Sequence, residues 1–236
     1  MNIKDITELS KLCGHVFKDN LVRFYSLLAS PRNFFSSIKY DTTEELIQAS
    51  VFAVFISALN LVIISPVQLS IGVDIETASY ALTDTVLTYS CWFLAGSVVH
   101  LLAKLLKGSG SYQSTVVAFL YLMAFTPILL LVSIPLELTT RHFIIESPFH
   151  SSYKVHLGVA ESMSKFPVLH ILSSVLQLAV VAYFIRCSVI VFRILHHVGR
   201  VRGVLIGVLG FAGWQLVTVF IKIPILQLFW KGVVAN

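Results

Sequence analysis

The chain has 236 residues, of which 56% are hydrophobic and only 12% are charged, whereas a soluble domain usually carries about a quarter charged residues. A water-soluble fold of this size could not bury so much apolar surface, so the composition excludes a disordered chain, a collagen-like fibre and an ordinary cytosolic enzyme. The net charge of +5 suits the basic cytoplasmic rim of a membrane protein better than a nucleic-acid partner.

Residues 1–45 form the first of two predicted parts, a polar segment on the cytoplasmic side of the membrane. Apolar residues recur at three- and four-residue steps from Phe17 to Leu28, which predicts an amphipathic helix lying on the inner leaflet. Thr42 stands three residues before Glu45, a spacing typical of a capping box at the start of a helix. Because the segment lacks an early apolar core, we do not expect a cleavable signal peptide.

A second short helix is predicted between these two features. Ser30 followed by Pro31 is typical of a helix start. Arg32 would meet lipid phosphates, while the rings of Phe34 and Phe35 would enter the membrane interface. The candidate interfacial anchors are Pro31, Arg32, Phe34 and Phe35.

The second predicted part, residues 46–236, holds five stretches that are long and apolar enough to cross the bilayer, which takes about 20 residues each. They cover residues 46–64, 86–106, 115–136, 168–195 and 203–221, the last with a continuation past Pro224 to residue 230. The expected fold class is therefore all-α, a polytopic membrane protein with five transmembrane helices after short interfacial helices. Pro127 and Pro224 are predicted to kink their helices.

The positions of Lys and Arg predict the orientation. With the amino terminus in the cytoplasm, 12 of them lie on the inner side and 5 on the outer side. An odd number of spans then places the carboxyl terminus outside.

A short glycine and serine turn joins the second span to the third. Gly108 and Gly110 are expected to supply positive φ angles for a tight return, and Ser111 or Ser114 is expected to cap the following helix. A nucleotide-binding phosphate loop needs a longer glycine motif followed by Lys-Ser or Lys-Thr, which this sequence lacks. The turn therefore does not predict such a site.

Two of these motifs resemble the Yip (Ypt-interacting protein) domain family. They are Ser30-Pro31-Arg32-Asn33-Phe34-Phe35 and Gly108-Ser109-Gly110-Ser111-Tyr112, with Tyr121 and Pro127 downstream. The resemblance covers about residues 26–225 and implies that Gly108, Gly110 and Tyr112 form a family loop. Eukaryotic members act in vesicle traffic between endoplasmic reticulum and Golgi and bind prenylated Rab-type GTPases through a long cytoplasmic segment.

The cytoplasmic segment of this chain is short, which resembles the compact bacterial branch of the family. The resemblance then implies the bacterial inner membrane, or the Golgi or endoplasmic reticulum membrane if the source is eukaryotic. It also implies a trafficking-like, non-enzymatic role.

The eight histidines and three cysteines predict neither a metal site nor a catalytic site. No two histidines have His-Glu-x-x-His spacing or lie four residues apart on one helix face. Gly96-Ser97 with His100 is the nearest approach to an intramembrane serine protease, and it reads better as a packed face of small residues. We expect no cofactor and no catalytic residue.

The fourth span carries the most informative charges. Residues spaced three or four apart share one face of this helix, so its basic groups lie together. These residues are Tyr183, Arg186, Ile190, Arg193, His197 and Arg200. Charged residues in spans usually face protein or water, so Arg186, Arg193, His197 and Arg200 are candidates for binding an anionic lipid headgroup, a phosphate or an acidic partner. In the alternative, Arg186 snorkels to the lipid boundary and the rest extends into the cytoplasm.

Two further features concern packing. Asp84 and Glu137 are predicted near the outer ends of their spans, at about the level of Lys222, so they could form a rim ion pair with it. The fifth span has a smooth face that allows close helix approach in lipid, either inside the bundle or between two copies as a homo-oligomer. That face consists of Gly203, Gly207, Gly210 and Gly213.

Two function hypotheses remain open. In the first, the protein is a membrane organiser or adaptor that engages lipids and protein partners through residues 15–45 and its basic inner surface. In the second, it is a transporter or lipid-handling protein that uses Arg186 as an anion site.

Overall fold

The structure, a computed structural model, describes residues 3–70, 77–145 and 162–225, with side chains for residues 14–66, 83–136 and 162–225. Within these ranges the chain forms helices and no strand. Five segments are long and apolar enough to cross a membrane, so the predicted fold class and number of spans are confirmed. These segments are Thr43–Pro66, Thr83–Leu105, Tyr112–Leu136, Pro167–His196 and Arg200–Ile225.

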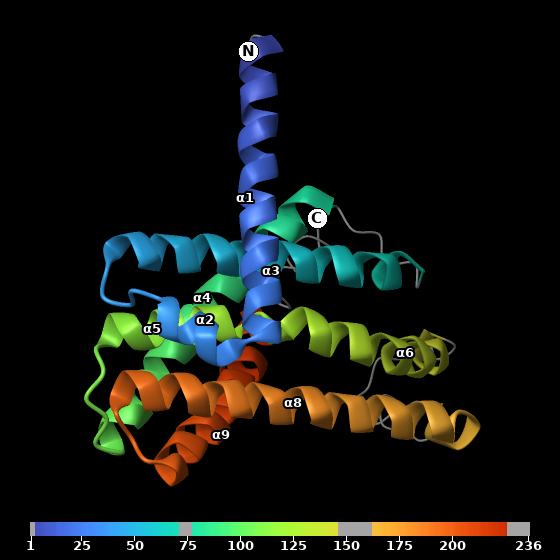
Figure 1. Cartoon of the computed structure of the whole chain (residues 1–236). Helices are drawn as coiled ribbons and strands as arrows, with labels where there is room; N and C mark the ends of the chain where they lie inside the picture. Colours follow the sequence, from blue (N-terminus) through green and yellow to red (C-terminus); the bar gives the residue numbers. More distant parts are fainter. Residues whose placement is uncertain (1–2, 71–76, 146–161, 226–236) are drawn as a thin grey trace.

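Figure 1 shows the long helices side by side, with α1 crossing them transversely. In chain order the helices are α1 (Ile3–Ala29), α2 (Pro31–Ser37), α3 (Thr43–Ser70), α4 (Thr77–Leu105), α5 (Tyr112–Leu122), α6 (Phe125–Ile145), α8 (Pro167–His196) and α9 (Arg200–Val217), then the π-helix η1 (Thr218–Lys222). α8 contacts α9 and α6, and α4 contacts α9 and α5. We call the end that carries α2 and residues 106–111 the α2 end, and the opposite end the far end.

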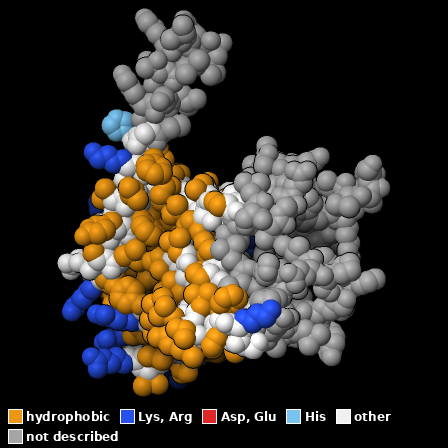
Figure 2. Space-filling view, turned by 90° about the vertical axis from the view of Figure 1, so that its right-hand side faces the viewer, with side chains coloured by type: hydrophobic (Ala, Val, Ile, Leu, Met, Phe, Trp, Pro, Cys, Tyr) orange, Lys and Arg blue, Asp and Glu red, His pale blue; other side chains and the backbone are white. Residues whose placement is uncertain are grey.

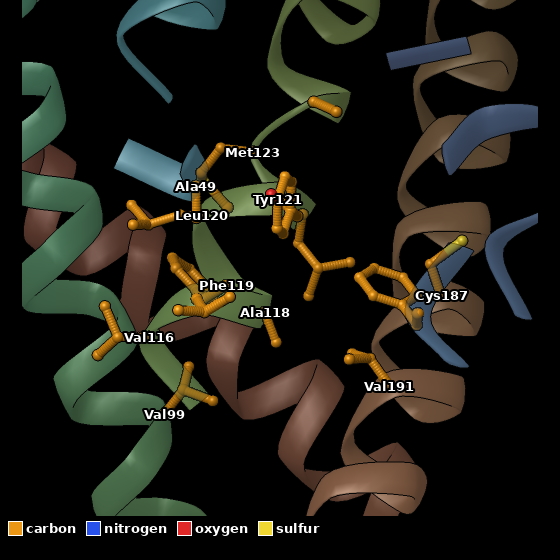
Figure 3. Packing of buried hydrophobic residues seen from close by; sticks show 14 of the residues in the cluster. Ala49, Val99, Val116, Ala118, Phe119, Leu120, Tyr121, Met123, Cys187 and Val191 are labelled. Carbon is orange, nitrogen blue, oxygen red and sulfur yellow. The ribbon is translucent and has the colours of Figure 1, made fainter. Parts of the chain in front are cut away.

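α5 is the centre of the core. Every side chain from Ser114 to Pro127 is buried, and apolar residues of α3, α4 and α8, among them Ala49, Val99 and Val191, surround it (Figure 3). A helix that is apolar all round suits such a buried position. We call residues 108–112 the family-like loop. The helix that begins at its last residue, α5, therefore holds α3, α4 and α8 together.

The predicted third span is two helices, because the chain breaks between α5 and α6. Pro127 has no N–H to donate to the carbonyl of Met123 four residues earlier. That carbonyl accepts instead from the N–H of Thr126 at 2.9 Å and from its hydroxyl at 2.8 Å. The prediction that Pro127 disturbs the helix is confirmed, as a break. Ahead of Pro224 the irregularity takes the form of the π-helix η1.

The predicted starts of the first two elements after α1 are confirmed. Pro31 is the first residue of α2, although the side chain of Ser30 makes no capping bond. The hydroxyl of Thr42 accepts from the N–H of Glu45 at 3.2 Å, so the cap of α3 is formed. The helix begins at Thr43, three residues before the predicted span.

The sides of the bundle are apolar, as contact with lipid requires. Val62 on α3, Leu178 on α8 and Phe220 on η1 are 69% to 71% exposed. Figure 2 shows hydrophobic side chains over most of the described surface in that view, with most of the Lys and Arg along its left edge and some beside the grey atoms. Because water would disfavour so large an apolar surface, these faces meet lipid or other membrane helices.

The glycine face of α9 lies inside the bundle. A Cβ added at Gly207 would stand 3.1 Å from Ser188 of α8, and one added at Gly210 would stand 2.9 Å from Val99 of α4. The intramolecular alternative accounts for these glycines, since they let α9 approach α8 and α4 closely.

Candidate functional site

The aromatic residues of α2 fix that helix to the bundle. Phe34 is 8% exposed and Phe35 is not exposed at all. The ring of Phe34 meets that of Tyr121 in α5 edge to face, with centroids 5.1 Å apart. The prediction that these two rings enter the membrane interface is therefore wrong, because they pack against protein. Pro31 is also buried, and only Arg32 of the four predicted anchors is exposed.

Docking of α2 on α8 brings the two predicted basic features together. Arg32 lines a hollow of about 640 Å³ with Arg186 and Arg193 of α8. All three side chains are exposed, and no acidic residue is among the described residues that line this hollow. We call it the arginine groove. Its electrostatics favour an anionic ligand, since guanidinium groups bind phosphate through paired N–H donors.

Tyr183 supports one wall of the arginine groove. The guanidinium carbon of Arg186 lies 5.7 Å from the centre of the Tyr183 ring, within the range of a cation–π contact. The hydroxyl of Tyr183 donates to the carbonyl of Leu28 in α1 at 2.7 Å. One aromatic side chain thus links α8 to α1 and supports the arginine above it.

His197 and Arg200 do not share the face of Arg186, in contrast to the sequence prediction. α8 ends at His196, and His197 takes a left-handed conformation with φ of 51°. Arg200 then begins α9, and His197 lines a separate hollow beside Asp41. The predicted stripe assumed a continuous helix, whereas a residue in the left-handed conformation ends it.

The family-like loop packs against His196. The N–H of Gly110 donates to Nδ1 of His196 at 3.1 Å. A Cβ at Gly108 or Gly110 would stand 2.8 Å from the same nitrogen, which is too close for any side chain. Neither glycine has the predicted positive φ, whereas the preceding Lys107 has a φ of 64°. The glycines are needed for close approach.

A polar network completes this contact. Because Nδ1 of His196 accepts from Gly110, the ring proton is on Nε2, which donates to the hydroxyl of Thr115 at 3.0 Å. That hydroxyl donates to the carbonyl of Ser111 at 2.8 Å, so it also accepts from Nδ1 of His100 at 3.1 Å. The histidines that the sequence left without a role hold α4, α5 and α8 together.

Tyr112, the last residue of the family-like loop, is half exposed at the start of α5. Its ring meets that of His100 edge to face, with centroids 5.4 Å apart. Its hydroxyl is 2.8 Å from the hydroxyl of Ser97. The loop residues Gly108, Gly110 and Tyr112 thus share one structural role at the α2 end.

Ser111 caps α5, as the sequence predicts. Its hydroxyl accepts from the N–H of Ser114 at 3.1 Å and donates to Asp41 at 2.7 Å. The hydroxyl of Ser114 donates to the same carboxylate oxygen at 2.7 Å. These bonds, of which that from Ser111 has the larger effect, lower the pKa of the Asp41 carboxyl below its ordinary value.

A second network, which sequence reasoning missed, holds α1, α3 and α5 together. The hydroxyl of Tyr121 donates to Glu45 at 2.5 Å and accepts from Arg23 at 2.9 Å. Arg23 also pairs with Glu45 at 3.5 Å and donates to Gln48. The available signal was Tyr121 itself, a hydroxyl in an otherwise apolar stretch that must find a partner when buried.

The predicted rim ion pair is present at the far end. Nζ of Lys222 lies 2.9 Å from Oδ1 of Asp84, whereas the side chain of Glu137 is outside the described residues. The pair lines a cavity of about 520 Å³ between α3, α4, α6, α8, α9 and η1. This cavity shares no lining residue with the arginine groove.

Within the described ranges, no three His, Cys, Asp or Glu side chains gather as a metal ion would require. Comparison with known proteins gives one finding: a family model described as the Yip1 domain matches residues 25–222. No curated protein and no solved structure matches the chain.

Proposed function

The chain belongs to the Yip1 domain family, and from that premise we propose that this multi-pass membrane protein acts without catalysis, as a membrane organiser or adaptor. In this proposal the arginine groove binds anionic lipid headgroups at the cytoplasmic face. The observation that carries the proposal is the docking of α2 on α8, which places Arg32 beside Arg186 and Arg193 in one hollow.

The energetics suit reversible lipid recognition. A basic side chain near an anionic membrane surface contributes about 1 kcal/mol, so three arginines together can select an anionic headgroup from a mixed membrane. Arg186 lies within the segment Pro167–His196, where a charge without a ligand or water is costly. A headgroup phosphate in the groove would satisfy it.

Protein partners would meet the exposed face of α1, the helix that precedes α2. Val22 and Tyr25 on α1 are 56% and 72% exposed, and the neighbouring Asp19 and Lys18 are exposed as well. A helix with both apolar and charged exposed residues suits a membrane surface or a partner helix. Because α1 is fixed to the bundle through Arg23, binding there would be communicated to α5.

The proposed location is the bacterial inner membrane, or the Golgi or endoplasmic reticulum membrane for a eukaryotic source. The amino terminus lies in the cytoplasm and the carboxyl terminus outside. The distribution of Lys and Arg supports this orientation. In this orientation the arginine groove would face the anionic cytoplasmic leaflet.

The second hypothesis, a transporter or lipid-handling protein that uses Arg186, is less well supported. Transport requires a path between the two ends of the bundle. Phe184, two residues before Arg186, is buried and its ring contacts those of Phe211 and Trp214, which line the far-end cavity. In the described part of the chain the two hollows are therefore separate.

Reconstitution distinguishes the two functions. The full chain and its Arg186→Ala variant are placed in vesicles with fluorescent anionic lipid in one leaflet, and lipid exchange between leaflets is followed by reduction of the exposed dye. In parallel, the lipids and proteins that co-purify in mild detergent are identified. An adaptor gives no exchange that depends on Arg186, and the variant loses co-purified anionic lipid. If the full chain exchanges lipid between the leaflets and the Arg186→Ala variant does not, the result would contradict the adaptor function and support transport.

A further inference from the structure

The far-end cavity has the features of a binding site that is independent of the arginine groove. Its lining combines the ion pair of Asp84 and Lys222 with the side chains of Asn60, Trp92 and Trp214. Its volume of about 520 Å³ lies in the usual range for small-ligand sites. We propose that this cavity binds a phosphoethanolamine group, with Asp84 and Asn60 accepting from its ammonium and Lys222 donating to its phosphate.

The ion pair has spare capacity toward the cavity. Lys222 has three N–H donors, of which Asp84 occupies one, and a carboxylate has about four acceptor positions, of which Lys222 and Thr88 take two. A zwitterionic group can therefore add to the pair without breaking it. A ligand with only one charge would bind either Asp84 or Lys222 and leave the free positions of the other residue unused.

Asn60 has a side-chain oxygen that lacks a hydrogen-bond donor among the described residues. Its side-chain Nδ2 donates to the hydroxyl of Thr126 at 2.9 Å. That hydroxyl donates its own proton to the carbonyl of Met123, so it can only accept from Asn60. The amide nitrogen of Asn60 must therefore be the atom that faces Thr126. The carbonyl oxygen Oδ1 of Asn60 is buried and has no partner in the described part of the chain. A primary ammonium can satisfy it, whereas a quaternary ammonium cannot.

The cavity is built where helices are irregular. Thr126 follows the break between α5 and α6, and Lys222 ends the π-helix η1. Broken helices and π-helical turns inside membrane proteins often mark ligand sites. The side chains of Lys222 and Asp84 are 21% and 13% exposed, so a ligand in the cavity can reach both charges.

The position of the charges favours a lipid as the source of this group. Asp84 stands 21 residues before the end of α4 at Leu105, and Lys222 stands 22 residues after the start of α9 at Arg200. At 1.5 Å per residue each charge is about 30 Å from the α2 end, which is the thickness of the hydrocarbon layer. Both therefore lie at the level of lipid headgroups at the far end. The deeper lining includes Trp92, Phe211 and Trp214, which suit the start of an acyl chain.

Tryptophan fluorescence reports occupancy. Trp92 is only 3% exposed, so bulk lipid quenches it poorly. Trp230→Phe leaves Trp92 and Trp214, which both line the cavity, as the two tryptophans of the chain. The full chain is reconstituted in a phosphatidylglycerol background and titrated with lipids brominated on the acyl chain near the headgroup. The headgroups compared are phosphatidylethanolamine, phosphatidylcholine, which has a quaternary ammonium, and phosphatidylglycerol, which has none.

We expect phosphatidylethanolamine to quench at severalfold lower mole fraction than the other two lipids. Asp84→Asn and Lys222→Gln should abolish this preference, whereas the control Arg202→Gln, an exposed charge on α9 at the α2 end, should retain it. Asn60→Leu keeps the ion pair and should reduce the preference even if the charge variants fail to fold. Equal quenching by all three lipids, or an unchanged preference in Asn60→Leu, would overturn the proposal.

A competition arm identifies the source of the group. Free phosphoethanolamine at millimolar concentration is added to the protein already quenched by the brominated lipid. Failure to restore fluorescence supports the lipid headgroup as the natural ligand. Recovery that depends on Asp84 supports the same chemistry with a soluble ligand, whereas recovery that persists in Asp84→Asn contradicts the site.

Discussion

The N–H of Gly110 donates a hydrogen bond to Nδ1 of His196, 86 positions later in the chain. This bond joins the loop before α5 to the last residue of α8. It explains why the loop contains glycines, because a Cβ at Gly108 or Gly110 would stand 2.8 Å from that nitrogen. The family-like loop is thus a contact between helices.

Gly108→Ala and Gly110→Ala should each destabilise the protein by about 1–3 kcal/mol, the usual cost of adding a methyl group to a packed contact. Thermal unfolding in detergent measures this effect. The control is Gly199→Ala, since a Cβ there meets nothing within 4 Å. An unchanged melting temperature in Gly110→Ala would refute the close contact with His196.

Tyr121→Phe should loosen α1 from the bundle, because it removes the hydroxyl that joins Arg23 to Glu45. Loss of such a hydrogen-bonded group costs about 1–3 kcal/mol. Faster hydrogen exchange confined to α1 and the start of α3 is the expected readout. Tyr112→Phe removes a hydroxyl that bonds Ser97 instead and should leave α1 as protected as in the wild type.

Asp41 should make the stability depend on pH at the acidic end. Hydrogen bonds from Ser111 and Ser114 lower the pKa of its carboxyl in the folded protein. The stabilisation is therefore complete above the unfolded pKa of about 3.9 and is lost as pH falls through the lower folded value. In Ser111→Ala with Ser114→Ala, the difference in melting temperature from the wild type should be present at pH 6 to 7 and shrink as pH falls below about 4. A difference that stays constant over this range would show that the carboxylate plays no part.

Gly210→Leu should lower stability and leave the oligomeric state unchanged, because Gly210 faces Val99 within the same chain. Val208→Leu, at a position that is 43% exposed, is the control for added bulk on the outside of α9. Light scattering coupled to size exclusion gives the mass, and thermal unfolding gives the stability. Dissociation of an oligomer by Gly210→Leu, with normal melting, would instead place the glycine face between two copies.

Composition and charge were sufficient to predict the spans and the ion pair of Asp84 with Lys222. Apolar length sets the number of crossings, and both charges had to stay near the span ends. The break after α5 was foreseeable as well, since Pro127 lacks the N–H that a continuous helix needs. These features depend on local sequence alone.

Other features depend on the tertiary structure. An apolar pattern does not distinguish a ring that meets lipid from one that meets protein, so Phe34 and Phe35 were assigned to the wrong environment. The periodicity of α8 gives no sign that His197 ends the helix. Glu45 and Tyr121 are 76 positions apart, and no local pattern links them.

The central claim is that Arg32, Arg186 and Arg193 act together on an anionic headgroup. Native mass spectrometry of the full chain with phosphatidylglycerol tests it most directly. Replacing all three by Gln should weaken binding about a hundredfold, at about 1 kcal/mol for each arginine. The matched triple variant Lys104→Gln, Lys107→Gln and Arg202→Gln removes the same charge from the α2 end outside the groove and should bind nearly as well as the wild type. Equal loss of lipid in both triple variants would contradict the account, because net charge alone would then explain the binding.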